Sequence, residues 1–214
     1  MLIAFTGCDG SGKSTQIVRI RDWLRSVRYD ADIVNKWDIL DPLRWPECRF
    51  IRTDLEDLRV CIAQMEGPAR ALFLFWSIFL TLSRSDLRSP AKIHLVDGYW
   101  MKHAAAELEY GCDEALIEAA IRSFPPADLV FYFDVAPEEA LRRKPELTPY
   151  ECGRDATLSP LSFLHHQTRV RRRMQSWIDR FGWVAVDSAP PADEVTGALR
   201  DHLEPLLRRL SRHR

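Results

Sequence analysis

The chain lacks paired cysteines, a secretion signal and any internal repeat. Its five cysteines are widely spaced, and no Cys-x-x-Cys pair occurs, so zinc-binding and redox motifs have no support. The number of cysteines is odd, and no signal-peptide pattern follows Met1. We therefore expect a reduced, cytoplasmic protein whose thiols are mostly buried.

An excess of one charge is also missing. The formal net charge is −1, so no overall field would recruit a nucleic acid polymer or an anionic membrane. Any anionic ligand has to be held by local basic residues. The most apolar run, residues 71–82, is shorter than the roughly 20 residues of a membrane span. It predicts a buried helix, part of which could form a subunit interface.

Strand-like and helix-like segments alternate along the whole chain. Short apolar runs at 2–5, 31–37, 92–99, 128–135 and 183–188 indicate strands. Helical spacing or helix-start signals mark 14–27, 54–66, 68–84, 101–110, 113–123, the segment from Pro137, 160–181 and 193–210. This order predicts an α/β protein with a parallel sheet and helices on both faces. We expect one domain over residues 1–214, with an irregular segment at 145–158.

A phosphate-binding loop follows the first strand. Residues 7–14, GCDGSGKS, match G-x-x-x-x-G-K-[ST] between a strand and a helix. The backbone N–H groups of such a loop converge on phosphate oxygens, and the helix N-terminus adds its positive end. The expected nucleotide-binding residues are Gly7, Asp9, Gly10, Ser11, Gly12, Lys13, Ser14 and Thr15. Lys13 should reach the outer phosphates, and the Ser14 hydroxyl should ligate Mg²⁺.

Two further stretches bear on the class of nucleotide-binding protein. Asp97 ends an apolar strand, where a carboxylate beside the phosphate loop can hold Mg²⁺ through water. Asn35-Lys36-Trp37-Asp38 matches the guanine-reading N-K-x-D of GTPases, but it comes too early in the chain. No D-x-x-G switch stretch accompanies it, so a GTPase is disfavoured.

The extended pattern F-x-G-x-D-G-x-G-K-S-T at residues 5–15 resembles the thymidylate kinases, within the nucleoside monophosphate kinases. Leu72 and Phe75 look like that family's L-x-x-F base-stacking segment, and residues 97–99 look like its D-R-Y stretch. Residues 128–144 are similar to the strand and helix that lead into its lid. The resemblance covers nearly the whole chain.

The resemblance implies a P-loop NTPase fold with three α/β/α layers, a five-stranded parallel sheet and a short lid at 145–158. It implies transfer of the ATP γ-phosphoryl group to a nucleoside monophosphate, dTMP or a related nucleotide, with Mg²⁺ as cofactor, and usually a homodimer. The expected catalytic residues are Lys13, Asp9, Arg142 and Arg143. The expected acceptor-binding residues are Asp9, Lys36, Phe75, Phe79, Asp97, Tyr99 and Lys102.

Several positions depart from the family pattern. The arginine of D-R-Y is Gly98, and the thymine-reading arginine after the stacking Phe is Phe79. The aromatic residue that crowds the sugar 2′ position is Ala106. The family's R-E-P stretch after the second strand reads Lys36-Trp37-Asp38. Lys36 therefore offers a single ammonium charge in place of the forked hydrogen-bond donors of an arginine. A site without thymine-reading groups loses much of its discrimination.

Two alternatives therefore stand beside a nucleoside monophosphate kinase. One is a kinase of the same fold that acts on a non-nucleotide or modified-nucleoside acceptor in a specialised pathway. The other is a nucleotide-binding protein with little turnover. Phe73, Trp76 and Leu80 share a helical face with more apolar surface than one pocket wall needs, which predicts a homodimer contact.

Overall fold

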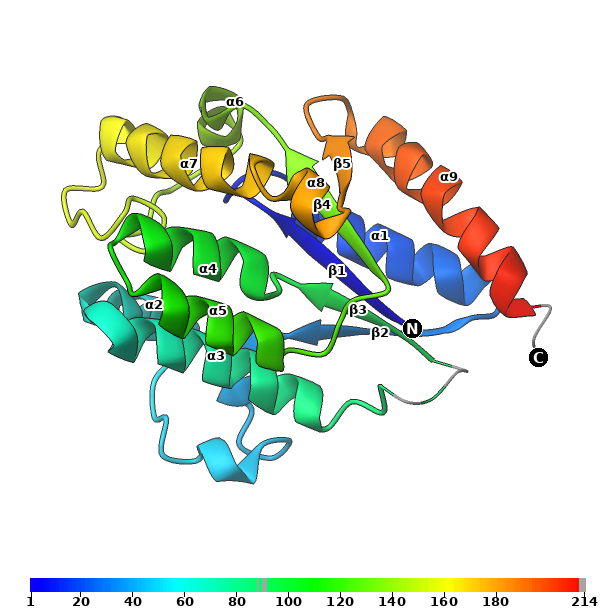
Figure 1. Ribbon diagram of the computed structural model, residues 1–214, viewed down its shortest axis with the longest axis horizontal. Coiled ribbons are helices and arrows are strands. Elements are labelled where there is room, and N and C mark those ends of the chain that lie inside the picture. The colour runs from blue at the N-terminus through cyan, green and yellow to red at the C-terminus, as the bar shows by residue number, and fades with distance from the viewer. Residues whose placement is uncertain (88, 90–91, 212–214) are drawn as a thin grey trace.

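A computed structural model describes residues 1–87, 89 and 92–211. Its core is one sheet of five strands in the order β2-β3-β1-β4-β5 (Figure 1), and every neighbouring pair is parallel. The strands are β1 (Leu2–Gly7), β2 (Asp30–Asn35), β3 (Lys92–Asp97), β4 (Leu129–Asp134) and β5 (Val184–Asp187). All five predicted strands are present, which confirms the parallel α/β architecture.

Helices cover both faces of this sheet. They are α1 (Lys13–Ser26), α2 (Leu55–Gln64), α3 (Gly67–Ser83), α4 (Trp100–Glu109), α5 (Glu114–Ser123), α6 (Pro137–Arg142), α7 (Pro160–Gln175), α8 (Ile178–Phe181) and α9 (Ala192–Ser211). Two short 3₁₀ helices, η1 (Lys36–Leu40) and η2 (Pro46–Cys48), follow β2. No helix within the described residues is long and apolar enough to cross a membrane.

Two apolar cores hold the three layers together, because side chains of each strand alternate between the faces. On one face, Ile3 and Phe5 of β1 pack with Ile17 of α1 and Leu199 of α9. On the other face, Ala4 of β1 packs in a core with residues of α3, α4, α5 and α7. The run at 71–82 lies within α3, as the sequence predicts.

Two of the differences from the predicted element boundaries coincide with specific contacts. The helix expected at 160–181 is interrupted after α7, where the Trp177 ring packs 6.3 Å from the rings of both Trp100 and Trp183. Packing of these aromatic rings here overrides the helical pattern. The second strand ends at Asn35, whose side chain accepts from the Trp37 N–H at 3.0 Å. Asp38 accepts from the Asn35 N–H, so the N-K-x-D residues close a local turn.

The apolar face of α3 that suggested a homodimer is covered within the chain. Phe73, Trp76 and Leu80 are partly buried against a cluster of Ile39, Trp45 and Cys48, which η1, η2 and their connection supply. This cover removes the surface argument for a dimer contact at these three residues. The homodimer itself stays a prediction.

The segment 145–158 contains turns and no helix or strand. It connects α6 to α7, at the left edge of Figure 1. Its Arg154 pairs with Glu66 at 2.8 Å and donates to the Ala63 carbonyl at 3.2 Å. Tyr150 lies 3.1 Å from His103 Nδ1. These contacts place the segment over α4 and the connection between α2 and α3.

Candidate active site

The phosphate loop joins β1 to α1 at the carboxyl edge of the sheet. Its turn needs Gly10, which has φ +80°, and a Cβ there would lie 2.7 Å from the Ala140 carbonyl oxygen. Lys13 Nζ donates to the Cys8 carbonyl at 2.8 Å and to Ser11 Oγ at 3.3 Å. The ammonium thus lies across the loop, where it can meet phosphate oxygens.

The two predicted metal-binding residues meet, although they are far apart in the chain. Ser14 Oγ donates to Asp97 Oδ2 at 3.0 Å. Asp97 is the last residue of β3, which pairs directly with β1, so the sheet carries its carboxylate to the start of α1. A hydroxyl and a carboxylate side by side at a phosphate loop are oxygen ligands of the type that Mg²⁺ takes beside nucleotide phosphates. The donor set therefore fits a magnesium ion.

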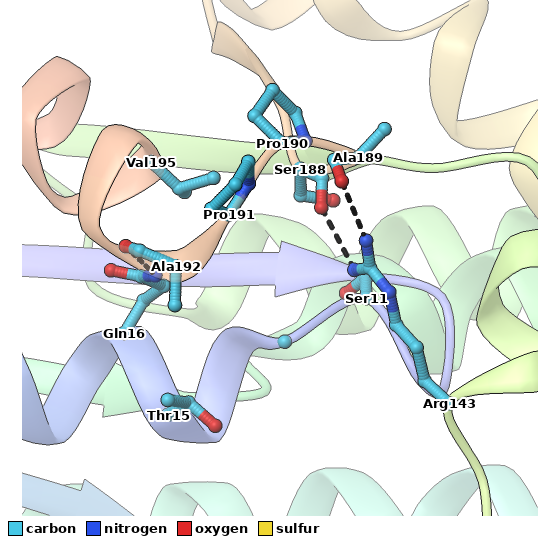
Figure 2. Close-up of a pocket in the computed structure, with 11 residues that line it drawn as sticks. Ser11, Thr15, Gln16, Arg143, Ser188, Ala189, Pro190, Pro191, Ala192 and Val195 are labelled. Atoms are coloured by element: carbon cyan, nitrogen blue, oxygen red, sulfur yellow. Dashed lines mark hydrogen bonds between the residues drawn. The ribbon is translucent and has the colours of Figure 1, made fainter.

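A first pocket, of about 470 Å³, opens on the α9 side of the loop. It is lined by Ser11, Gly12, Thr15, Gln16, Arg143, Ser188, Ala189, Pro190, Pro191, Ala192 and Val195, shown in Figure 2. The Arg143 guanidinium donates to the Ser188 and Ala189 carbonyls at 2.8 and 2.9 Å. Most of the lining surface is apolar. Such a pocket beside a phosphate loop suits the base and sugar of a nucleotide.

A second pocket, of about 140 Å³, opens on the other side of the same loop. Its lining is predominantly polar: Asp9, Lys13, Ser14, Asn35, Lys36, Trp37, Arg59, Asp97, Gly98, Lys102, His103, Tyr150 and Glu151. Four of these side chains are cations, namely Lys13, Lys36, Arg59 and Lys102. The phosphate loop separates this cationic pocket from the first one. We call it the acceptor pocket, after Asp9, Lys36, Asp97 and Lys102, which the sequence predicts to bind an acceptor.

Asp9 is held from two helices. Lys102 Nζ lies 2.5 Å from both carboxylate oxygens, and Gln167 Nε2 donates to one of them at 3.3 Å. Gln167 Oε1 accepts the Asp9 N–H at 3.1 Å, and its Nε2 also donates to the Glu151 carbonyl at 2.8 Å. Burial alone would raise the pKa of Asp9, but Lys102 and Lys13 outweigh it and hold that pKa below the usual range. Asp9 is therefore an ionised anchor.

Lys36 is a buried cation in the acceptor pocket, at 9% exposure. Within the described residues it has no ion-pair partner; its ammonium lies 4.4 Å from the centre of the Trp37 ring. Burial, reinforced by the charge of Lys102, lowers the pKa of Lys36 to about 7. An anion bound in the pocket would supply the negatively charged partner that Lys36 lacks.

Three predicted acceptor-binding residues lie elsewhere. Phe75 and Phe79 pack on the Phe124 ring, with centroids 5.6 and 3.9 Å away. Tyr99 is fully buried, and its hydroxyl donates to the Pro125 carbonyl at 2.6 Å. Acceptor contact by these three residues stays a prediction. On α3, Arg70 and Leu74 are the side chains that line the space beside the acceptor pocket. Phe75 is one residue, or roughly 100°, further round the helix than Leu74.

The two arginines predicted to be catalytic have different surroundings. Arg142 forms an ion pair with Glu139, and its side chain is 75% exposed. Arg143 lines the first pocket and is tied to the connection between β5 and α9. Neither arginine lines the acceptor pocket. Their catalytic role therefore stays a prediction, and the position of Arg143 favours contact with the nucleotide.

Sequence reasoning assigned no site role to Arg59, His103, Tyr150, Glu151 or Gln167. His103 is 2% exposed, and its Nε2 is a buried polar atom without a partner among the described residues. These side chains come from α2, α4, the 145–158 segment and α7. No sequence motif links these residues, because only the packing of their separate elements brings them together at the site.

The fold and the phosphate loop define a P-loop NTPase. No family model matches the chain. A thymidylate kinase of Oleidesulfovibrio alaskensis is 28% identical over 94% of this chain and 95% of its own. Probable thymidylate kinases of Archaeoglobus fulgidus and Sulfurisphaera tokodaii are 27% and 23% identical, over 97% and 91% of this chain and 96% and 90% of their own. Over most of its length the chain is similar to curated thymidylate kinases, at identities of 23–29%.

Proposed function

We propose that the chain is an ATP-dependent phosphotransferase that moves the ATP γ-phosphoryl group to an acceptor bearing its own phosphate. The observation that carries this proposal is the phosphate loop with a pocket on each side. One pocket is mostly apolar and the other is lined by Lys13, Lys36, Arg59 and Lys102. A protein that only binds a nucleotide needs the first pocket alone.

Each group has a role that its position supports. The loop and Lys13 would bind the outer phosphates of ATP, and the wall that includes Arg143 would hold its base. Ser14 and Asp97 would hold Mg²⁺, which neutralises phosphate charge when bound. Lys36 would hold the acceptor's phosphate, while Asp9 keeps Lys102 in place. Phosphoryl transfer depends mainly on positioning and charge neutralisation, and these groups would supply both.

Two acceptor classes are candidates. The names of the relatives favour a nucleoside monophosphate, dTMP or a related nucleotide. The core positions of Phe75 and Phe79, which leave no stacking residue from α3 in the acceptor pocket, favour a non-nucleotide acceptor. A homodimer and a cytoplasmic location remain parts of the proposal that rest on the family resemblance and the composition.

The experiment is a measurement of ADP production from ATP and Mg²⁺ with a panel of phosphate monoesters. The panel includes deoxy- and ribonucleoside monophosphates and sugar phosphates, with nucleosides as unphosphorylated controls. Acceptor-dependent ADP production that stops in Lys13→Ala supports the phosphotransferase. ATP binding without acceleration by any acceptor would favour the nucleotide-binding protein with little turnover.

A further inference from the structure

The space between α3 and α4, beside the acceptor pocket, is filled by an ion pair of the chain itself. Arg70 of α3 donates from Nε to Glu107 Oε1 of α4 at 2.8 Å. The two side chains are 4% and 2% exposed. Ala106, whose position faces the acceptor's sugar in the family resemblance, lies in the same space. The pair therefore fills space beside the acceptor pocket, into which a bulky group attached to a bound phosphate would have to extend.

Aromatic side chains enclose this ion pair. The Arg70 guanidinium lies 4.0 Å from the centre of the Tyr110 ring. Tyr110 in turn stacks on His166, with ring centroids 5.4 Å apart and planes 17° apart. Tyr150 of the 145–158 segment also lines the space. The pair is thus held by α3, α4, α7 and that segment together.

Little volume remains beside the pair. The cavity that Arg70 and Glu107 line measures about 10 Å³, against about 140 Å³ for the acceptor pocket. The two spaces share Lys102, His103 and Tyr150 in their walls, so they are adjacent. A cavity of about 10 Å³ has room for about one water molecule. A nucleobase could enter only by separating two buried, paired charges, which is strongly unfavourable.

The acceptor pocket itself is built for a compact anion. Neither Lys36 nor Arg59 has an ion-pair partner within the described part of the chain, whereas Lys102 forms an ion pair with Asp9. The buried Nε2 of His103 also lacks a partner there. A Cβ at Gly98 would lie 3.6 Å from Lys36 Nζ, which is ordinary van der Waals contact, so the ammonium lies directly beside Gly98.

We propose that the acceptor is a phosphate monoester whose organic part is no larger than a sugar and carries no nucleobase. This inference rests on the proposed phosphotransferase and narrows its acceptor. An oxygen of the acceptor's phosphate forms the new bond to the γ-phosphorus of ATP. The bond from that phosphorus to the bridging β,γ-oxygen breaks, and ADP leaves with the electron pair. No proton has to move, because the phosphate of a monoester loses its second proton near pH 6.

Calorimetric titration of the full chain with ribose 5-phosphate and with dTMP tests the ligand class. We expect ribose 5-phosphate to bind at least about tenfold more tightly, because the base has no place to go. Equal or tighter binding of dTMP overturns the inference, and so does failure of both to bind. ADP production is measured in parallel. If ribose 5-phosphate binds preferentially without any turnover, the phosphotransferase fails while the ligand class of the pocket stands.

A pair of double variants tests the cause of the selectivity. Arg70→Ala/Glu107→Ala removes the ion pair and enlarges the space, whereas Arg70→Met/Glu107→Leu removes the charges and keeps most of the volume. Circular dichroism first establishes that both variants are folded. The enlarged variant should gain affinity for dTMP by about tenfold over the volume-matched one. If the two double variants bind dTMP alike while the wild type still excludes it, the filled space between α3 and α4 is not the cause of the selectivity.

Discussion

The ammonium of Lys36 lies 3.6 Å from the point that a Cβ on Gly98 would occupy. Gly98 has φ +70°, a conformation that residues with side chains rarely adopt. In the family pattern an arginine at this position helps to hold phosphate. Here a lysine that follows β2 places its charge beside a glycine that follows β3. Lys36 itself stands where the family pattern has another arginine, so one of the two expected positive charges is present beside Gly98 and the other is absent.

Replacing Lys36 by Met should weaken acceptor binding much more than ATP binding. We expect the KM for the acceptor to rise by about tenfold or more, because a charge-assisted hydrogen bond contributes roughly 1.5–3 kcal/mol. Steady-state kinetics with each substrate varied separately provide the measurement. Lys92→Met, a partly exposed lysine that pairs with Asp32, is the matched control. A rise confined to the KM for ATP would contradict the prediction, because it would show that Lys36 contributes to ATP binding instead of acceptor binding.

Phosphate binding at Lys36 should weaken as the pH rises above 7. The pKa of Lys36 is about 7, so its ammonium is present below that pH and is progressively lost above it. The charged and titratable groups that share its pocket are Asp9, Lys13, Arg59, Asp97, Lys102, His103, Tyr150 and Glu151. Between pH 7 and 9 a phosphate monoester is already fully ionised, since its second pKa is about 6. Calorimetry with ribose 5-phosphate in metal-free buffer measures the effect, and Lys36→Arg should abolish the decline.

Lys13→Ala should remove activity with every acceptor. Lys13 reaches the Cys8 carbonyl across the loop, where the outer phosphates of ATP would lie. Loss of one such charge-stabilising donor lowers kcat by about a hundredfold or more. ADP production with saturating ATP measures it, and an unfolding curve checks that the variant is folded. Activity within a few-fold of wild type would contradict the assignment of the phosphate loop as the catalytic centre.

Arg143→Ala should raise the KM for ATP. The side chain ties α6 to the Ser188 and Ala189 carbonyls in the wall of the first pocket. Loss of two hydrogen bonds of about 1 kcal/mol each corresponds to roughly a tenfold to thirtyfold effect. Arg142→Ala provides the comparison, because within the described part of the chain Arg142 forms an ion pair only with Glu139 of its own helix. A large fall in kcat for Arg142→Ala would instead support the predicted catalytic role.

Removing one partner of the Arg70–Glu107 pair should destabilise the fold more than removing both. Arg70→Met leaves a carboxylate that is 2% exposed without its partner, which costs about 3–5 kcal/mol. Arg70→Met/Glu107→Leu should recover most of that loss, since paired apolar replacements are often neutral. Urea unfolding of the three proteins gives the free energies. Equal destabilisation by the single and double variants would show that the carboxylate finds another partner.

The sequence was sufficient for the parts of the site that depend on local spacing. The phosphate loop is a contiguous motif, and the alternation of strands and helices predicts the parallel sheet. Because the carboxyl ends of parallel strands share one edge, Asp97 could be expected beside Ser14, and their oxygens lie 3.0 Å apart. Helix boundaries were also close, apart from the interruption after α7.

Only the tertiary structure decided which face of each helix meets a ligand. A shift of one residue turns a helical side chain by about 100°, so Phe75 packs on Phe124 while Leu74 borders the space that holds Arg70 and Glu107. The pairing of Arg70 with Glu107 and of Arg143 with the Ser188 carbonyl joins segments distant in the chain. Such contacts depend on how whole elements pack. The sequence therefore predicts where a phosphate would bind, and only the packing determines which side chains surround that place.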